Sequence, residues 1–402
     1  MKYCTKCLYA EKTNIKIFFD EQGQCPACVN VKYAKDKINW DQRLTKLKKL
    51  FQDQKKNSDY DVLIGVSGGK DSYFQADLAI NILGLNALLV TYYGNNFTED
   101  GEYNLRRMKK IFKCDHLIFK PDTETLVKMN RLGFYIQGDM NWHNHCGIYT
   151  YPIQEAIKND IKFILWGEHD YMYRVGMYSY DDYVEFTQKY RKEHSLRGYE
   201  WYNFTDDGLR KLGFDKKKEN LTKKNLHWAV YPSDHEIKKV GLRGIYASNY
   251  VYWDGRNNAK ISQEKYGWRE YSKEFQRTYS KISNLDDMHE NGAHDYLKFI
   301  KFGYGRATDH ATKDIRLGYM TREEGIEMVK KYDHIKPTED LDRWYKYVNI
   351  DEDEFNRVSD TFRDPSVWYI KNNKWYKNNI WGGSSSYGEV FLSNKDKVKY
   401  FR

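Results

Sequence analysis

A loop of small and charged residues between an apolar run and a helical pattern is the feature that most constrains the fold of this chain. The stretch DVLIGVSGGKDS at residues 61–72 starts like a buried strand and breaks into SGGKDS, and a helical pattern follows over residues 73–83. The two glycines let the backbone approach an anion, the helix start offers unpaired N–H groups, and the two serines add hydroxyl donors. The sequence therefore predicts a phosphate-binding loop. Its spacing matches neither the Walker A loop nor the dinucleotide motif GxGxxG, and an ordinary tight turn is the alternative.

SGGKDS after a strand resembles the signature SGGxDS of the PP-loop ATP pyrophosphatases. Enzymes of this family cleave ATP between its α and β phosphates and transfer AMP to a carbonyl oxygen. The resemblance implies that the loop holds the departing pyrophosphate and that Asp71 helps to bind Mg²⁺, while Lys70 occupies the variable position, where its charge suits a phosphate. ATP and Mg²⁺ are therefore the expected cosubstrate and cofactor, with Lys70 and Asp71 in catalytic roles. The expected nucleotide contacts in the loop are Ser67, Gly68, Gly69, Lys70, Asp71 and Ser72.

Composition is that of a globular protein outside the membrane. The length of 402 residues suggests two or three domains. The mean hydropathy is −0.87 and no long apolar segment occurs, so no membrane span is expected. The N-terminal MKYCTKCLYA lacks the apolar core of a secretion signal, which favours a cytoplasmic location. A net charge of +9 favours anionic partners, but Lys and Tyr are abundant along the whole chain, so nucleic acid is not the expected partner.

Four cysteines near the N-terminus form two CxxC pairs. Cys4 and Cys7 are followed, after 17 residues, by Cys25 and Cys28, which is the spacing of a Cys₄ zinc ribbon. Zn²⁺ would stabilise a module that is too small to have a core of its own, and four protein ligands leave no open position, so the metal is expected to be structural. Two disulfides or a redox dithiol are the alternatives, and both are less expected in a cytoplasmic chain.

The pattern of apolar segments predicts an α/β fold with a parallel sheet, an N-terminal zinc ribbon, a helical insertion and a helical C-terminal part. From residue 171 the chain becomes aromatic, charged and poorly periodic, which interrupts the alternation of strands and helices. The expected parts are the ribbon at 1–39, a linking helix at 40–57, the PP-loop core at 58–170, an inserted subdomain at 171–239, a return to the core at 240–268 and a mostly helical region at 269–402.

Two segments of the predicted core carry further candidates. In PP-loop enzymes the chain just after the second strand, here ALLVTY at 87–92, tends to approach the adenine and ribose, which makes Tyr92, Tyr93 and Asn95 candidates. A strand at 161–166 is followed by GEHD, at the edge where ligands bind in open α/β sheets. Glu168 or Asp170 is therefore a candidate to take Mg²⁺ or a substrate hydroxyl, with Glu168 assigned the catalytic role, and a solvated loop is the alternative.

The segment HNHCGIYTYPIQ at 143–154 is dense in nucleophile-like groups. Cys146 directly follows His145, and adjacent residues on a strand or helix point apart, so a thiol and imidazole pair is not expected. Cys146 and its neighbour Gly147 are instead assigned to the nucleotide site as structural residues.

A polar tract near the C-terminal third, KFGYGRATDHATKDIR at 301–316, combines two glycines with charged residues. Asp309 and His310 are candidates to position ammonia or a hydroxyl, and the arginines of the tract, Arg306 and Arg316, are candidates to meet substrate phosphates. Asp309 is assigned a catalytic role, and Lys301, Arg306 and His310 are assigned to substrate binding. A capped, salt-bridged helix junction explains the same residues. The next helix is predicted to start at Thr321, because TREE has the form of a capping box.

The two CxxC pairs, VSGGKDS and the tract from residue 301 together resemble the N-acetyl sugar amidotransferases, PP-loop enzymes of bacterial surface-glycan and nonulosonic acid pathways. The resemblance implies that the oxygen of a sugar acetamido group attacks the α-phosphate of ATP and that ammonia then displaces AMP, leaving an acetamidino group. The acceptor is expected to be a nucleotide-activated sugar. Residue 2 is Lys and no GxCxG elbow occurs, so a separate glutaminase subunit is the expected source of ammonia.

Two other functions stay open at this point. A tRNA-modifying PP-loop enzyme, either a thiolase or a lysidine-type ligase, fits the basic charge and the ribbon, although Cys114 and Cys146 form no CxxC pair for sulfur transfer. A zinc-ribbon adaptor that binds nucleotide without turnover is the second alternative, and the intact Asp71 argues against it.

Overall fold

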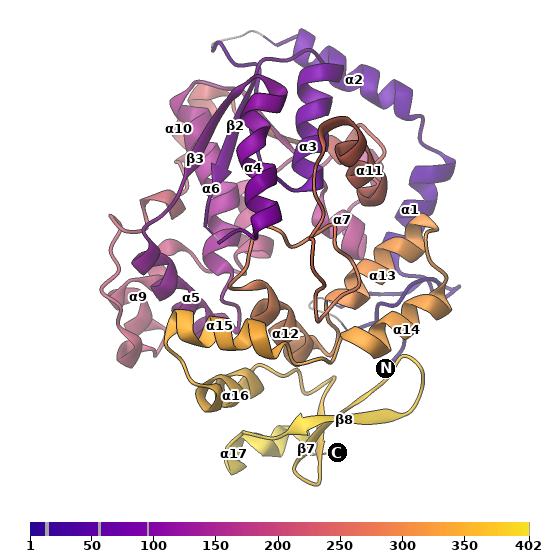
Figure 1. Ribbon diagram of the computed structural model, residues 1–402, viewed down its shortest axis with the longest axis vertical. Coiled ribbons are helices and arrows are strands. Elements are labelled where there is room, and N and C mark those ends of the chain that lie inside the picture. The colour runs from indigo at the N-terminus through magenta and orange to yellow at the C-terminus, as the bar shows by residue number, and fades with distance from the viewer. Residues whose placement is uncertain (13–15, 55–57, 95, 402) are drawn as a thin grey trace.

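A parallel sheet of five strands lies at the centre of the upper part of the molecule (Figure 1). The structure is a computed structural model that describes residues 1–12, 16–54, 58–94 and 96–401. The strand order is β3-β2-β1-β4-β5 and every neighbouring pair is parallel, so the order reverses between β1 and β4. This confirms the predicted α/β fold class. The strands are β1 (Val62–Gly65), β2 (Ala87–Tyr92), β3 (Asp115–Phe119), β4 (Phe163–Trp166) and β5 (Arg243–Tyr246).

Alternate residues of the strands belong to two hydrophobic cores. Ile64 and Leu89 pack with α3, α4 and α11 on one face, whereas Leu63 and Val90 pack with α6 on the other. Because both faces are covered, β1 and β2 are apolar at nearly every position. The covering helices are α3 (Lys70–Ala76), which continues as a π-helical segment (Asp77–Ile82), α4 (Glu99–Phe112), α5 (Thr123–Gln137), α6 (Trp142–Lys158) and α11 (Gly255–Tyr266).

Two helices connect the cysteine segment to the sheet. They are α1 (Pro26–Asp36) and α2 (Trp40–Gln52). Leu47 and Phe51 of α2 enter the core on the α3 side of the sheet. The expected linking helix thus ends at Gln52, and residues 55–57 of that segment lie outside the described part of the chain.

Short helices and turns fill the segment between β4 and β5. The helices are α7 (Asp170–Val175), α8 (Gln188–Tyr190), α9 (Asp206–Lys211) and α10 (Asp234–Val240). Leu196, Phe204 and Trp228 of this segment form a core with Tyr92 and Trp142, so the segment packs beside the ends of β2 and α6. The segment therefore extends the sheet domain on the side of α5 and α6.

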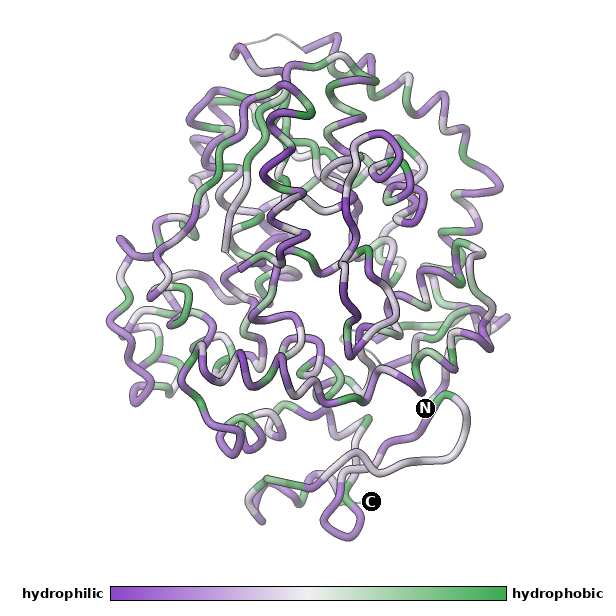
Figure 2. Tube along the Cα trace, in the orientation of Figure 1, coloured by the Kyte–Doolittle hydropathy of each residue, from purple (hydrophilic) through white to green (hydrophobic). Residues whose placement is uncertain are grey.

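The C-terminal part lies below the carboxyl ends of the strands (Figure 1). Five helices precede a small antiparallel sheet of order β6-β7-β8. Among the described residues, no helix has the length and apolarity needed to cross a bilayer (Figure 2). These elements are α12 (Asn291–Phe302), α13 (Arg306–Leu317), α14 (Arg322–Tyr332), α15 (Thr338–Val348), α16 (Glu352–Thr361), β6 (Tyr369–Lys371), β7 (Lys374–Asn378), β8 (Ser384–Glu389) and α17 (Asn394–Lys397).

The sequence patterns predicted the positions of these helices and strands well but placed some of their first or last residues wrongly. The helix after the loop was expected from residue 73 and begins at Lys70, because Gly69 already acts as its N-cap residue. The expected return to the core at 240–268 contains the strand β5, which ends at Tyr246 and turns into a short 3₁₀ segment. The predicted capping box is confirmed, since the Thr321 side chain accepts from the Glu324 N–H and the Glu324 carboxylate accepts from the Thr321 N–H.

Candidate active site

The SGGKDS loop leaves the carboxyl end of β1 at the point where the strand order reverses, which is where open α/β sheets bind ligands. Gly68 has φ of +78°, and a Cβ there would lie 2.7 Å from the Leu105 backbone of α4. The Ser67 N–H donates to Ser72 Oγ at 3.0 Å, and Trp268 Nε1 donates to the Gly68 carbonyl at 3.0 Å. The loop is therefore held in shape by α3, α4 and the chain after α11 together.

Lys70 and Asp71 occupy the first turn of α3 and pair with each other. Lys70 Nζ lies 2.7 Å from Asp71 Oδ2, and Asn258 Nδ2 of α11 donates to Asp71 Oδ1 at 3.1 Å. Burial alone would raise the pKa of Asp71, but the Lys70 ammonium and the Asn258 amide hold that pKa below its ordinary value. Asp71 is thus an ionised oxygen donor of the kind that Mg²⁺ prefers, so its chemistry fits the implied metal.

A cavity of about 300 Å³, here called the loop cavity, joins this turn to α13. Glu168, two residues after the end of β4, receives a hydrogen bond of 2.6 Å from Lys313 Nζ of α13. Two elements that are distant in the sequence thus meet across one cavity. Its lining includes Lys70, Asp71, Glu168, Arg256, Asp309 and Lys313.

Asp309 and His310 lie side by side at the start of α13 but in different settings. Asp309 pairs with Lys298 and accepts a hydrogen bond of 2.7 Å from Tyr9 Oη. Burial opposes its ionisation, yet the positive charges of Lys298, Arg174 and Arg306 hold the pKa of Asp309 far below its ordinary value. Burial lowers the pKa of His310 to about 3, with the nearby Arg306 adding to the effect, so its ring is neutral at physiological pH. It shares a hydrogen bond of 2.7 Å with Thr278 Oγ1.

A second cavity of about 330 Å³, here called the lysine cavity, adjoins the loop cavity, and Arg306 lines both. Arg306 is anchored by Asp295, with nitrogen–oxygen distances of 2.6 and 2.9 Å. Lys301 is only 6% exposed, and no salt bridge or hydrogen bond of its ammonium is found among the described residues. Burial, with the positive charge of Arg197 adding to the effect, lowers the pKa of Lys301 to about 7.

A third cavity of about 210 Å³, here called the tyrosine cavity, lies beside the loop over β1 and β2. Ser67, Ser72 and Tyr92 line it, and aromatic and aliphatic side chains make up much of the rest. Such a mostly apolar wall with a few polar groups is the usual setting for a nucleotide base. Tyr93 instead donates to Glu102 at 2.9 Å, and Asn95 lies outside the described residues.

Cys146 and Gly147 lie behind Tyr92 on α6. A Cβ at Gly147 would lie 2.4 Å from the Tyr92 ring, so the glycine permits close packing there. The Cys146 sulfur contacts Thr150 and the Arg191 guanidinium, and among the described residues it is not part of the lining of these three cavities. Both residues support the wall that carries Tyr92, and direct nucleotide contact by either stays a prediction.

Asp286 is a site residue that the sequence did not reveal. It lines both the lysine and the tyrosine cavities and hydrogen-bonds the Ser67 side chain, while burial raises its pKa above the ordinary value. It occurs in the segment NLDDMHE, which has no periodic or glycine signal. Asn258 and Lys313 were missed for the same reason, since a single amide or ammonium in a helix has no local signature.

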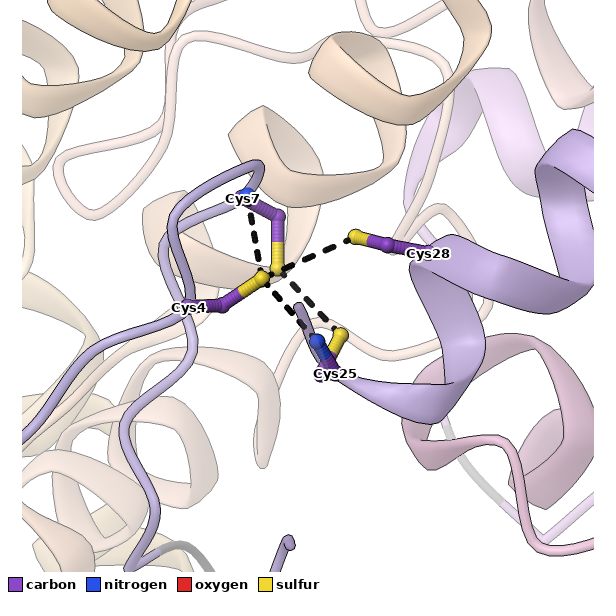
Figure 3. Close-up of side chains that lie close together, drawn as sticks. All are labelled: Cys4, Cys7, Cys25 and Cys28. Atoms are coloured by element: carbon purple, nitrogen blue, oxygen red, sulfur yellow. Dashed lines mark hydrogen bonds between the residues drawn. The ribbon is translucent and has the colours of Figure 1, made fainter. Parts of the chain in front are cut away.

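The four cysteines of the N-terminal segment point toward one another (Figure 3). The Sγ atoms of Cys4 and Cys28 lie 3.9 Å apart, those of Cys7 and Cys25 lie 3.7 Å apart, and all four lie within 4.8 Å of one another. Sulfurs at the corners of a tetrahedron around Zn²⁺ would be about 3.8 Å apart, given zinc–sulfur bonds of about 2.3 Å. The cluster therefore fits the implied zinc, and all four cysteines are free thiols rather than disulfides.

The parallel sheet and the SGGKDS loop at its switch point define the fold class, an α/β fold that resembles the PP-loop ATP pyrophosphatases. Residues 264–380 match the family model described as LPS biosynthesis protein WbpG-like, C-terminal domain. This match covers under a third of the chain and contains α12, α13 and thus Lys301, Arg306 and Asp309. No curated protein matches the sequence.

Similar solved structures include three with low sequence identity. The NH3-dependent NAD synthetase from Campylobacter jejuni, in complex with nitrate, has 13% identity, covers 59% of this chain and 100% of its own, and has a TM-score of 0.29. The NMN synthetase from Francisella tularensis has 13% identity, covers 57% of this chain and 96% of its own, and has a TM-score of 0.29. The U34-tRNA thiolase NcsA from Methanococcus maripaludis, with its 4Fe-4S cluster, has 14% identity, covers 79% of this chain and 87% of its own, and has a TM-score of 0.29. The class assignment therefore rests on the strand order and the loop.

Proposed function

We propose that this chain is an ATP-dependent amidotransferase that converts a sugar acetamido group into an acetamidino group in the biosynthesis of a bacterial surface glycan. The observation that carries the proposal is the loop cavity, in which the PP-loop turn faces α13. Helix α13 belongs to the stretch that matches a domain named for LPS biosynthesis. The cavity between the predicted phosphate-binding loop and a helix of the LPS biosynthesis match supports the proposal.

The chemistry needs activation because an amide carbon is a poor electrophile. In the first step the acetamido oxygen attacks the α-phosphorus of ATP, the bond to the β-phosphate oxygen breaks, and pyrophosphate leaves. In the second step ammonia adds to the imidate carbon, AMP leaves with the electron pair of the carbon–oxygen bond, and a proton is lost to solvent. The loop amides and Lys70 are suited to hold the pyrophosphate, and Asp71 is suited to hold Mg²⁺, which when bound neutralises charge on the phosphates.

We assign the adenosine to the tyrosine cavity and the acceptor to the lysine cavity. The two cavities meet at Asp286, so the α-phosphate would lie between them. Lys301 and Arg306 supply positive charge for an anionic group of the acceptor. Glu168, Asp309 and His310 face the loop cavity and are the candidates to orient a hydroxyl or ammonia.

A separate glutaminase is the proposed source of ammonia, because the sequence offers no glutaminase nucleophile motif. Purified chain should turn over with ammonium chloride and not with glutamine. If the chain alone turned over with glutamine as fast as with ammonium chloride, the proposal of a separate glutaminase would be refuted.

The decisive test of the function is pyrophosphate release from ATP and Mg²⁺ across a set of nucleotide-activated acetamido sugars, with tRNA as the comparison. A sugar-dependent signal, with AMP and an amidino product detected by mass spectrometry, supports the proposal. Release that depends on tRNA and on no sugar would replace it with a tRNA-modifying function.

A further inference from the structure

The cysteine segment reaches the loop cavity directly. Tyr9, two residues after Cys7, is 3% exposed and lines that cavity. Its hydroxyl donates to Asp309 Oδ1 at 2.7 Å. Its ring lies under the Arg316 guanidinium, with 5.2 Å between the guanidinium carbon and the ring centroid. An N-terminal module therefore supplies a hydrogen-bond donor to a carboxylate of the candidate active site.

Arg316 forms the second connection. From the last turn of α13 its guanidinium lies 3.6 Å from Cys7 Sγ, 3.3 Å from Cys25 Sγ and 3.4 Å from Cys28 Sγ. The same group donates to the carbonyls of Tyr173 and Arg174 at the end of α7. The fourth sulfur, of Cys4, instead accepts from the backbone N–H groups of residues 6, 7 and 25. All four sulfurs thus have N–H donors.

Electrostatics explains why this arginine is placed there. Four thiolates around Zn²⁺ carry a net charge of about −2, and a buried charge is costly unless it is paired and hydrogen-bonded. Arg316 is the cation in contact with three of the sulfurs. Its orientation is therefore set by the cluster, and through it the cluster is joined to α7 and α13. These two helices carry Arg174, Asp309 and Lys313 of the loop cavity.

We propose that the metal-loaded cysteine cluster is a positioning element of the active site, with Tyr9 holding Asp309 and Arg316 holding α7 and α13 in place. This proposal takes from the proposed function only the assignment of the loop cavity as the active site. It gives the ribbon a role in shaping that cavity, in addition to stabilising the N-terminal segment.

Hydrogen exchange tests the proposal without any substrate. The zinc-loaded chain is compared with the chain after removal of zinc by a chelator, peptide by peptide. We expect exchange in residues 170–175 and 306–317 to become at least tenfold faster on metal removal. Exchange in α16 should be unchanged, because Phe355 of α16 packs in a different hydrophobic core from that of the cysteines. Faster exchange confined to residues 1–36 would overturn the proposal, because the ribbon would then be an independent module.

Variants provide a second test that does not depend on stability of the metal-free chain. Arg316→Lys keeps the charge but loses the three-sulfur contact, and Arg322→Met is the matched control. Arg322 also joins the ribbon to a C-terminal helix, through the carbonyls of Cys4 and Cys7. In the described part of the chain it has no hydrogen bond to a sulfur and is not among the residues lining the loop cavity. We expect zinc-loaded Arg316→Lys to show faster exchange in both α7 and α13, and Arg322→Met to show neither change. Equal behaviour of the two variants would overturn the proposal.

Tyr9→Phe isolates the link to Asp309. The ring stays in place, so zinc content and exchange in α7 should match the wild type. With an acceptor sugar in hand, we expect kcat to fall about tenfold, and this loss should vanish in an Asp309→Asn background because the two residues act as one unit. Additive losses in the double variant would overturn the role of Tyr9. Failure to find any turnover would contradict the proposed function and leave the exchange results as the test of the ribbon.

Discussion

Replacing Lys301 by Met should make the folded protein more stable while weakening acceptor binding. The ammonium is buried without an ion pair among the described residues, and burial lowers its pKa from 10.5 to about 7. At about 1.4 kcal/mol for each pKa unit, and with half of the folded molecules protonated at pH 7, this difference corresponds to on the order of 4 kcal/mol. Met has a similar length and no charge, so the free energy of unfolding of the variant should be higher by most of this difference.

The pH dependence has a definite sign. Between pH 7 and 10.5 the unfolded chain binds more protons than the folded chain at this position, so the wild type gains stability as pH rises through this window. The advantage of Lys301→Met should therefore be largest at or below pH 7, fall to about half near pH 9 and disappear near pH 10.5. Urea unfolding followed by tryptophan fluorescence, at several pH values, measures this difference.

Lys346→Met is the matched control, because Lys346 is an exposed residue of α15 and its replacement should leave stability within about 0.5 kcal/mol at every pH. The reasoning is refuted if Lys301→Met is no more stable than the wild type at pH 7, or if its advantage does not shrink with rising pH. The same variant should raise the KM for an anionic acceptor, whereas the affinity for ATP should stay unchanged, because Lys301 lines only the lysine cavity of the three.

Four further predictions concern the loop, the metal and the histidine. Asp71→Asn should abolish pyrophosphate release and keep the fold, as measured by a coupled assay and circular dichroism; near-normal turnover would remove Asp71 from the mechanism. Gly68→Ala should destabilise the loop by more than 1 kcal/mol and abolish ATP binding in calorimetry, since its Cβ would meet the Leu105 backbone at 2.7 Å, whereas Gly84→Ala, also at positive φ but in open space, should cost about 1 kcal/mol and leave ATP binding intact. Metal analysis should find one zinc per chain, and a value well below one would contradict the zinc assignment. Because the pKa of His310 is about 3, pH profiles of kcat between 5 and 8 should show no step that His310→Gln removes, and such a step would contradict a neutral imidazole.

The sequence by itself determined the parts whose chemistry is local. SGGKDS after an apolar run predicted the strand, the turn and the helix start, because glycine conformation, helix N–H groups and hydroxyl donors all lie within a few residues. The two CxxC pairs predicted the cysteine cluster because the two ligands of each pair also lie within a few residues of each other. Apolar segments at 87–92 and 161–166 predicted strands that the structure contains, and the parallel sheet confirms the α/β class.

Tertiary structure alone decided which distant residues complete the site. Asn258 reaches Asp71 across 187 positions of sequence, and Tyr9 reaches Asp309 across 300. No local pattern marks such partners, since a lone amide or hydroxyl has the same sequence signature on any surface. They are brought together because β1 and β4 end at one edge of the sheet, where α11 packs against α3 and where α13 and Tyr9 of the cysteine segment line the loop cavity. The SGGKDS loop thus predicts a phosphate site, and the packing of these three segments determines which side chains surround that site.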